Sequence, residues 1–504
     1  MDVINQLILG FSVAIQPINL FYCFLGCLIG TLVGVLPGLG PTAAMSLLLP
    51  TTFHITPVTA IIMLAGIYYG AMYGGSTTSI LVNIPGEAAS VMTCLDGYAM
   101  ARQGRAGPAL GISAFGSFIA GTIGLVGLSF LSPPLVSFAL KFGPPEYFSL
   151  LSMGLVVLSF LTSTSMIQSL MMACFGIIIG TVGIDTVSGS TRFTFGIMEL
   201  MDGVGLVPLV MGLFGISEIL LNLEQKIDRD IFMTKVKGLF PTVQDWMQAK
   251  WAILRGTVIG FFLGILPGGG AVLSSFVAYA IEKRVSKTPE KFGTGMIEGV
   301  AAPESANNSA AQAAFIPLLT LGLPSNVVMA VLLGALIIHG VTPGPLLLSQ
   351  HPDVFWGVVA SMYLGNIMLL ILNLPLIGMW VQLLKVPYPL MMPLIIIFCL
   401  IGSYSIASSI TDVFIMLFFG IIGYLMKKFR YEAPPLVLAF VLGPMLEYYL
   451  KSSLMMSHGS FLIFFEHPIS AVCLTITFVL LFLPLLKTVR LKRVAVAEKA
   501  EEIT

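Results

Sequence analysis

Long apolar segments alternate with short polar ones along most of this chain. A helix needs about 20 apolar residues to cross a bilayer. Segments that meet or approach this length lie at residues 19–36, 58–82, 109–131, 147–162, 167–182 and 204–222. A hydrophilic stretch follows at 223–255, and further apolar segments come after it. The pattern predicts an all-α polytopic membrane protein with roughly 11–14 membrane segments, some of them re-entrant or broken helical hairpins.

Two polar motifs interrupt the apolar pattern at positions expected to lie at membrane depth. The first contains Gly74, Gly75, Ser76, Thr77 and Thr78 and continues to Asn83 and Pro85. The second contains Glu304, Ser305, Asn307, Asn308 and Ser309 and continues to Thr320, Pro324 and Ser325. Lipid cannot satisfy open backbone groups, so non-helical backbone there is buried in protein or lines an aqueous cavity. We expect the motifs to interrupt the helices and to form a substrate and ion site together.

A sequence repeat relates the two motifs. Residues 264–270 repeat the Leu-Pro-Gly pattern of residues 34–40 at a distance of 230 residues, and Pro324 follows Pro85 by 239. Repeats of this kind are typical of secondary transporters. The expected parts are a first transmembrane repeat at 1–222, a cytoplasmic connecting segment at 223–255, a second transmembrane repeat at 256–426, and a C-terminal hairpin with a basic tail at 427–504.

The distribution of Lys and Arg predicts how the repeats are oriented, because cytoplasmic loops collect these residues. Loop 51–57 has neither, whereas the matching loop 282–291 has four. Loop 94–107 has two, whereas the matching loop 341–353 has none. Each pair reverses, so we expect the two repeats to be inverted relative to each other across the membrane.

The Leu-Pro-Gly turns allow two interpretations. Proline ends a helix and glycine supplies a positive φ, so each turn can simply join two helices. Alternatively, the helix that begins after each turn points free N–H groups into a cavity and attracts an anion. The candidate residues for such a site are Gly38, Gly40, Gly268 and Gly270.

The polar side chains of the motifs also allow two interpretations. Small polar residues commonly form hydrogen bonds between membrane helices. They also offer oxygens to a cation and donors to a carboxylate. Four polar side chains within residues 305–309 exceed what packing usually needs, which favours a site. A sodium ion near Ser76, Asn307 and Asn308 is one candidate occupant.

Glu304 is an acid inside the second motif, where an ionised carboxylate is unfavourable and marks function by default. A proton or cation role suits it, although an acid at a loop end facing water is the alternative. Residues 73–93 and 297–330 contain no Lys or Arg. A helix terminus carries roughly half a unit charge. We therefore expect hydroxyls, amides and helix termini to hold an anionic substrate without Lys or Arg, and Na⁺ or H⁺ to balance its charge as the coupling ion.

Composition excludes several other classes. Of the 504 residues 57% are hydrophobic and 10% charged, with zero formal net charge, so no basic surface for nucleic acid is expected. The six cysteines form no CxxC pair, the five histidines no HExxH, and no phosphate-binding GKS or GKT loop occurs. We expect no enzyme and no cofactor besides the coupling ion. Asp96, Arg102 and Arg105 are interpreted as surface residues, and Asp185 with Arg192 as part of an external loop that is solvated or meets a partner.

At these residues the chain resembles the large membrane subunit of the tripartite tricarboxylate transporters. The matching stretches are residues 30–41, 73–76, 96–98, 103–104, 303–308, 317–324 and 440–447. The chain departs from the family at Ser325, where glycine is usual. The resemblance implies a multi-pass protein of the bacterial inner membrane. It also implies a small membrane subunit and a periplasmic substrate-binding protein as partners, and citrate or a related small carboxylate as substrate, taken up with Na⁺ or H⁺.

The function expected from the sequence is therefore ion-coupled import of a small carboxylate by a permease subunit. A channel or exporter of the same architecture that acts alone is the main alternative, and a membrane-embedded enzyme is a more distant one.

The inverted orientation can be tested by chemical labelling. Single cysteines placed in loops 51–57 and 282–291 are expected to react with a membrane-impermeant thiol reagent from opposite sides of the membrane, the first from outside. Labelling of both loops from one side would contradict the inversion.

Overall fold

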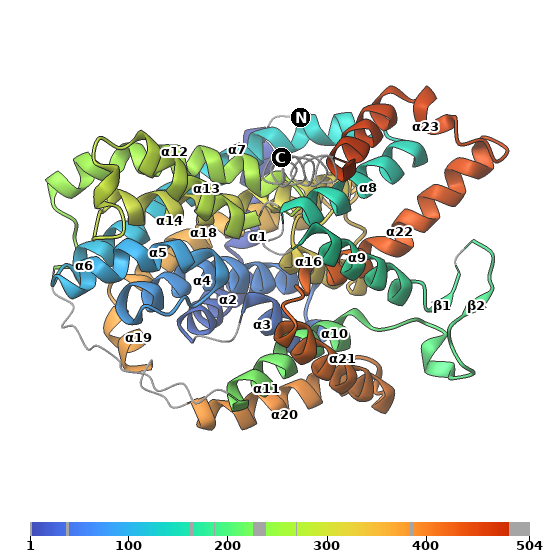
Figure 1. Ribbon diagram of the computed structural model, residues 1–504, viewed down its shortest axis with the longest axis horizontal. Helices are drawn as coiled ribbons and strands as arrows, with labels where there is room; N and C mark the ends of the chain where they lie inside the picture. Colours follow the sequence, from blue (N-terminus) through green and yellow to red (C-terminus); the bar gives the residue numbers. More distant parts are fainter. Residues whose placement is uncertain are drawn as a thin grey trace, which may run out of the picture. The chain divides into compact units, whose positions relative to one another are not determined.

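The computed structural model describes residues 3–36, 40–161, 165–185, 187–224, 238–268, 270–383 and 388–482. Helices make up nearly all of this part of the chain, and one two-stranded sheet accompanies them (Figure 1). The expected all-α polytopic class is confirmed. Seven helices within the described residues are long and apolar enough to cross a membrane, and shorter apolar helices of 10–17 residues accompany them. The inversion of the repeats stays a prediction.

The chain forms two compact units, each built from two separate parts of the sequence. The first unit comprises Met1–Leu140 and Val204–Ala433, and the second comprises Lys141–Gly203 and Pro434–Thr504. The domain boundaries expected from the repeats stay a prediction, because this division follows packing rather than the repeat.

The helices of the first unit are α1 (Val3–Ala14), α2 (Pro17–Val35), α3 (Pro41–Leu48), α4 (Pro57–Val82), α5 (Val91–Thr93), α6 (Ala99–Arg102), α7 (Ala106–Ala139), α10 (Leu206–Val210), α11 (Ser217–Glu224), α12 (Val243–Ile265), α13 (Gly270–Val285), α14 (Glu298–Ala313), α15 (Phe315–Leu321), α16 (Val327–Ile338), α17 (Leu347–Gln350), α18 (Pro352–Asn373), α19 (Ile377–Leu383), α20 (Tyr388–Ala407) and α21 (Ile410–Lys428). Short 3₁₀ or π-helical segments lie at Leu49–His54, Ala88–Ser90, Cys94–Tyr98, Met211–Ile216 and Pro289–Lys291.

The second unit contains α8 (Pro144–Leu161), α9 (Met166–Gly180), β1 (Gly183–Ile184), β2 (Thr191–Arg192), a 3₁₀ turn at Met198–Leu200, α22 (Pro434–Met456) and α23 (Ile463–Glu466). Strands β1 and β2 pair antiparallel, with Gly183 opposite Arg192.

An ionic network holds the β1–β2 hairpin of the second unit. Lys451 lies 2.7 Å from a carboxylate oxygen of Asp185, and Arg192 makes two hydrogen bonds to Glu447. The hydrogen bond from Lys451, followed by one from Ser188, lowers the pKa of Asp185 below its ordinary value. Asp185 and Arg192 of the expected external loop are thus paired within the chain.

Helices α2 and α4 of the first unit pack with their backbones in direct contact. Gly26, Gly30 and Gly34 recur every four residues along α2 and therefore share one face. A Cβ atom at these positions would overlap the carbonyl oxygens of Met63, Ile67 and Ala71 in α4. Only glycine permits this separation, which is the packing device expected between membrane helices.

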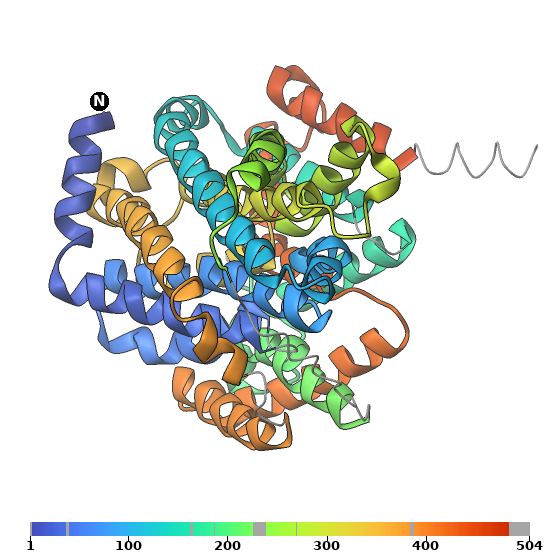
Figure 2. The same cartoon turned by 90° about the vertical axis from the view of Figure 1, so that its left-hand side faces the viewer.

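The same arrangement recurs between α12 and α14, which lie together in Figures 1 and 2. Gly256, Gly260 and Gly264 of α12 face the carbonyl oxygens of Ala302, Ala306 and Ala310 of α14. The glycines follow those of α2 by 230 residues and the carbonyl groups follow those of α4 by 239, which are the distances found between the sequence repeats. The repeat in sequence is therefore also a repeat in helix packing.

Both repeats break their helices at matching places. Helix α4 ends at Asn83 (φ 59°) and α15 ends at Gly322 (φ 72°), and each left-handed residue precedes a proline by two positions. A left-handed residue followed by proline is a common helix ending. The breaks before Pro85 and Pro324 were expected.

Residues 304–309 of the second polar motif do not interrupt a helix, contrary to expectation. Residues 298–313 form one helix, α14, with Pro303 inside it. Residues 74–78 are likewise helical, in α4. Residues 74–78 and 304–309 therefore lie on buried helices, and the irregular backbone begins only at Asn83 and at Gly322. Because these amides and hydroxyls pack against other helices, lipid does not have to satisfy them.

Asp96 is also misplaced by the sequence interpretation, which put it on the surface. It is completely buried in the π-helical segment Cys94–Tyr98. Its Oδ1 accepts hydrogen bonds from the backbone N–H groups of Gly293, Gly295 and Met296, and its Oδ2 accepts one from the hydroxyl of Tyr279. A carboxylate of the first repeat thus fixes the loop that leads into α14.

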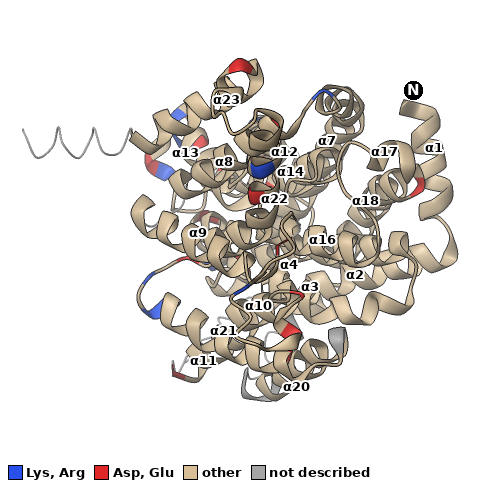
Figure 3. Cartoon of the chain, turned by 90° about the vertical axis from the view of Figure 1, so that its right-hand side faces the viewer, with Lys and Arg blue, Asp and Glu red and all other residues tan. Residues whose placement is uncertain are grey.

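Charged residues are sparse over the whole cartoon, as Figure 3 shows. The few buried acids of the first unit therefore stand out, and several of them meet the two polar motifs.

Helix packing yields a direct test. Gly30→Val and Gly260→Val would each force apart a pair of backbones, and overpacking of this kind costs about 1–3 kcal/mol. We expect both variants to melt at lower temperature than the wild type in detergent. The control is Gly378→Val, because an added Cβ at Gly378 meets no neighbour. Wild-type melting of both test variants would contradict the close packing.

Candidate functional site

Glu304 of α14 is completely buried. Its two carboxylate oxygens accept hydrogen bonds from the hydroxyls of Ser76 in α4 and Thr93 in α5. The alternative of an acid facing water at a loop end is therefore wrong. Residues from both polar motifs meet at this carboxylate, as the sequence predicts.

A second acid, Glu87, lies in the break that follows α4 and is 8% exposed. Its Oε2 accepts from the backbone N–H of Ala89 at 2.8 Å and caps the segment Ala88–Ser90. Its Oε1 accepts from Nδ2 of Asn307 at 3.3 Å. Asn307 follows Glu304 by three residues on α14, so Glu304 and the amide that contacts Glu87 lie on one face of this helix. We refer to Glu87, Glu304, Ser76, Thr93 and Asn307 as the carboxylate cluster.

Several polar atoms of α14 have no hydrogen-bond partner although they are buried. They are Ser305 Oγ, Asn307 Oδ1, Asn308 Oδ1 and both side-chain polar atoms of Gln312, and Ser325 Oγ of the second helix break shares this property. Buried polar groups are normally hydrogen-bonded. Several unpartnered polar atoms close together on one helix therefore indicate a place where a ligand, an ion or water binds. Amide, hydroxyl and carboxylate oxygens are the ligands that hard cations prefer.

The two helix breaks contact the opposite repeat in matching ways. Glu87 accepts a hydrogen bond from Asn307, while Asn326 donates from Nδ2 to the hydroxyl of Tyr68 at 3.3 Å. Asn326 follows Glu87 by 239 residues, and Asn307 follows Tyr68 by the same distance. Each residue also caps the segment after its break, Glu87 through Ala89 N and Asn326 through Met329 N. A two-fold relation between the repeats generates reciprocal contacts of this kind.

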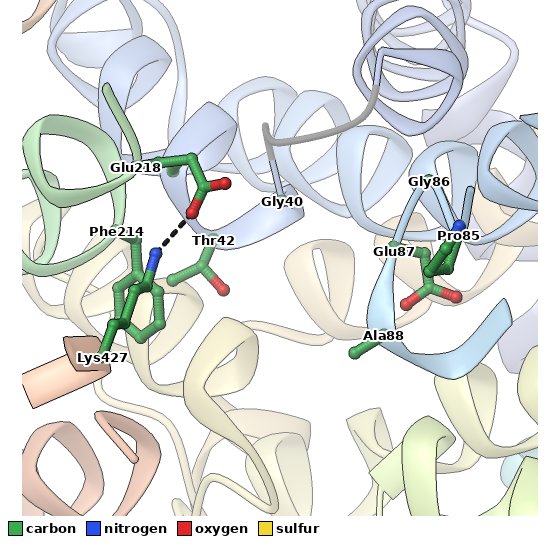
Figure 4. Close-up of a pocket in the computed structure, with 10 residues that line it drawn as sticks. Gly40, Thr42, Pro85, Gly86, Glu87, Ala88, Phe214, Glu218 and Lys427 are labelled. Atoms are coloured by element: carbon green, nitrogen blue, oxygen red, sulfur yellow. Dashed lines mark hydrogen bonds and ion pairs between the residues drawn. The ribbon is translucent and has the colours of Figure 1, made fainter. Parts of the chain in front are cut away.

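Glu87 of the carboxylate cluster also lines a cavity of about 250 Å³ (Figure 4). Its lining residues are Gly40, Thr42, Ala43, Pro85, Gly86, Glu87, Ala88, Phe214, Glu218 and Lys427. The cavity is thus lined by the start of α3, by the break after α4, and by side chains from the region of α11 and α21.

The structure gathers part of the predicted site. Ser76, Glu304 and Asn307 belong to the carboxylate cluster, and Gly40 and Pro85 line the cavity. Gly75 adjoins the side chain of Glu87. Asn308 Nδ2 donates a hydrogen bond to Ser117 Oγ at 2.7 Å, and the side-chain oxygen Oδ1 of Asn308 has no partner.

Other predicted residues have mainly structural contacts. The hydroxyls of Thr78, Ser309 and Thr320 bond to backbone carbonyls of Val35, Thr257 and Ile316. Gly74 packs against the carbonyl group of Thr31. Gly268 N donates to Ser325 O at 2.8 Å, and Gly270 has φ 51° beside Asn326. Thr77 is buried, Asn83 and Pro324 shape the breaks, and Gly38 lies outside the described residues.

The sequence interpretation missed Glu87, Glu218 and Lys427. Glu87 directly follows Pro85-Gly86, so an acid at a predicted helix break was an available signal. Glu218 and Lys427 lie 209 residues apart, and their pairing depends on the packing of α11 against α21.

The amides of α14 offer a test of the site. Asn307→Ala removes the hydrogen bond to Glu87, and Asn308→Ala removes an unpartnered oxygen. We expect each variant to insert normally and to lose transport. Thr320→Ala is the control, because its hydroxyl bonds only to its own helix. Normal uptake by both asparagine variants at equal membrane abundance would show that these residues only pack.

Comparison with known proteins identifies the family of this chain. Residues 20–438 match the model of the tripartite tricarboxylate transporter TctA family. An uncharacterized 52.8 kDa protein in the TAR-I ttuC' 3' region of Agrobacterium vitis is 50% identical over 493 residues, which cover 98% of each chain. An uncharacterized protein in the TAR-II ttuC' 3' region of the same organism is 51% identical over 234 residues, or 46% of this chain and 97% of the relative. No solved structure matches. The chain belongs to the TctA family of tripartite tricarboxylate transporters, and the expected family is confirmed.

Proposed function

We propose that this chain is the large permease subunit of a binding-protein-dependent secondary transporter that imports a small carboxylate together with Na⁺ or H⁺. The name of the family, a tripartite tricarboxylate transporter, supports the substrate class and the need for partners. The partners are a small membrane subunit and a periplasmic binding protein, and the site of action is the bacterial inner membrane.

The observation that carries the proposal is the pair of buried acids, Glu87 and Glu304. Their described hydrogen-bond donors are hydroxyl, amide and backbone N–H groups, and no Lys or Arg is among them. A buried carboxylate without a counter-charge is strongly unfavourable unless it takes up a proton or a cation. The cluster is therefore suited to bind a proton or a cation at membrane depth.

Charge balance connects this loading to the substrate. Glu87 lines the cavity, so its negative charge repels a carboxylate that enters there. A proton on the cluster, or a sodium ion among its oxygens and the free amide oxygens of α14, removes this repulsion. Anion and cation then favour each other's binding, which is the thermodynamic basis of symport.

The test is uptake of labelled citrate and related carboxylates by proteoliposomes that contain the chain with its two partner proteins. We expect accumulation to depend on an inward gradient of Na⁺ or H⁺. Uptake that responds to neither gradient would refute the coupling, and absence of carboxylate uptake would refute the substrate class.

Glu304→Gln separates coupling from binding. Glutamine keeps the shape of the protonated acid but can neither release a proton nor attract a cation with full charge. We expect the variant to lose gradient-driven accumulation, by about tenfold or more, while exchange of labelled for unlabelled carboxylate persists. The control is Glu290→Gln, since Glu290 is an exposed acid before α14. Gradient-driven accumulation at the wild-type level would exclude Glu304 from coupling.

A further inference from the structure

The cavity lined by Glu87 has features that the polar motifs do not explain. Its volume of about 250 Å³ lies just below the range of about 300–1,000 Å³ that is typical for drug-sized ligands. It is large enough for a small molecule and too small for a bulky one. Glu87 lies toward one end of the cavity, and the ion pair of Glu218 with Lys427 lies toward the other (Figure 4).

Lys427 is the one cationic side chain among the ten residues that line the cavity. It comes from the last turn of α21 and forms its ion pair with Glu218 of α11. The side chains are 33% and 26% exposed, so neither is locked in a dry core. A partly hydrated pair of this kind contributes little to stability and can exchange partners.

The start of α3 supplies neutral donors on the same cavity. Thr42 is only 8% exposed, lines the cavity, and its hydroxyl makes no hydrogen bond to any described residue. Proline at position 41 has no N–H, and the first bond within the helix runs from Ala44 N to Gly40 O. The N–H groups of Thr42 and Ala43 therefore lack a partner in the helix, at the end where the helix dipole is positive.

We propose that this cavity binds one carboxylate group of the substrate between the first turn of α3 and Lys427, and that Lys427 leaves Glu218 to pair with it. While the cavity is empty, the carboxylate of Glu218 pairs with Lys427 in place of the substrate carboxylate. The inference rests on the proposed function for the class of substrate. It replaces the expectation that no Lys or Arg meets the substrate, because Lys427 reaches the site from outside the two motifs.

The positions of Glu87 and Glu218 determine how substitutions should change the affinity for the substrate. A carboxylate in the cavity has Lys427 and the start of α3 near one end and Glu87 near the other. Lys427 is fully available only when it separates from Glu218, so Glu218 and substrate compete for one cation. Removing Glu218 should therefore strengthen substrate binding, whereas removing Lys427 should weaken it.

Direct binding to the purified full-length chain tests this competition. Equilibrium binding of labelled citrate, and of succinate as a smaller dicarboxylate, is measured in sodium-containing buffer. Hydrogen bonds to charged groups contribute about 1.5–3 kcal/mol, which corresponds to tenfold or more in affinity. We expect Lys427→Gln to weaken binding about tenfold, Lys427→Arg to restore part of it, and Glu218→Gln to tighten it several-fold. Lys428→Gln is the matched control and should bind as the wild type does, because Lys428 pairs with Glu224 and does not line the cavity.

Three outcomes would overturn the inference. They are binding by Lys427→Gln within twofold of the wild type, weakening by Glu218→Gln as large as that by Lys427→Gln, and absence of binding of both probes to the wild type. If Lys427→Gln does not fold, Glu218→Gln decides alone, since tightening supports the exchange and weakening overturns it. Binding with these signs but without uptake in proteoliposomes would refute the proposed transport and leave the binding site standing.

Discussion

The direct backbone contact between helices at paired glycines is the constraint on which the first unit depends. Gly26, Gly30 and Gly34 fix α2 on α4, and Gly256, Gly260 and Gly264 fix α12 on α14. Those two supported helices, α4 and α14, carry both polar motifs. A membrane interior offers no hydrophobic drive to bring helices together, so close packing must supply the attraction. The positions of Ser76 on α4 and of Glu304 and Asn307 on α14 follow from that packing.

Local features of the chain were predictable from sequence, and contacts between distant segments were not. Pro85 and Pro324 end helices through their own geometry, and the distances of 230 and 239 residues reappear in the packing. The site was predicted in part, because Ser76, Glu304 and Asn307 do meet. The helicity of α14 was missed, since burial against other helices keeps its polar side chains away from lipid, and these side chains looked like signs of a break.

The remaining errors concern charge. Asp96 follows a Gly-rich pattern that is typical of surface loops, yet three backbone N–H groups and a hydroxyl compensate its burial. Lys427 belongs to a basic run at the end of a helix, where sequence indicates only contact with the cytoplasm. Whether such a residue reaches a cavity depends on side-chain direction and on neighbours hundreds of residues away. No periodicity in the sequence reports either.

The reciprocal contacts at the two helix breaks have a consequence for how the halves can move. Each break is hydrogen-bonded to the opposite repeat, the first through Glu87 to Asn307 and the second through Asn326 to Tyr68. The contact at the first break contains a carboxyl group, whereas the contact at the second joins an amide to a phenol hydroxyl. A change of protonation or of bound cation therefore alters the strength of one contact and leaves the other constant. The two breaks are built alike, but protonation can weaken the contact at the first while the contact at the second is kept, so the two breaks need not open together.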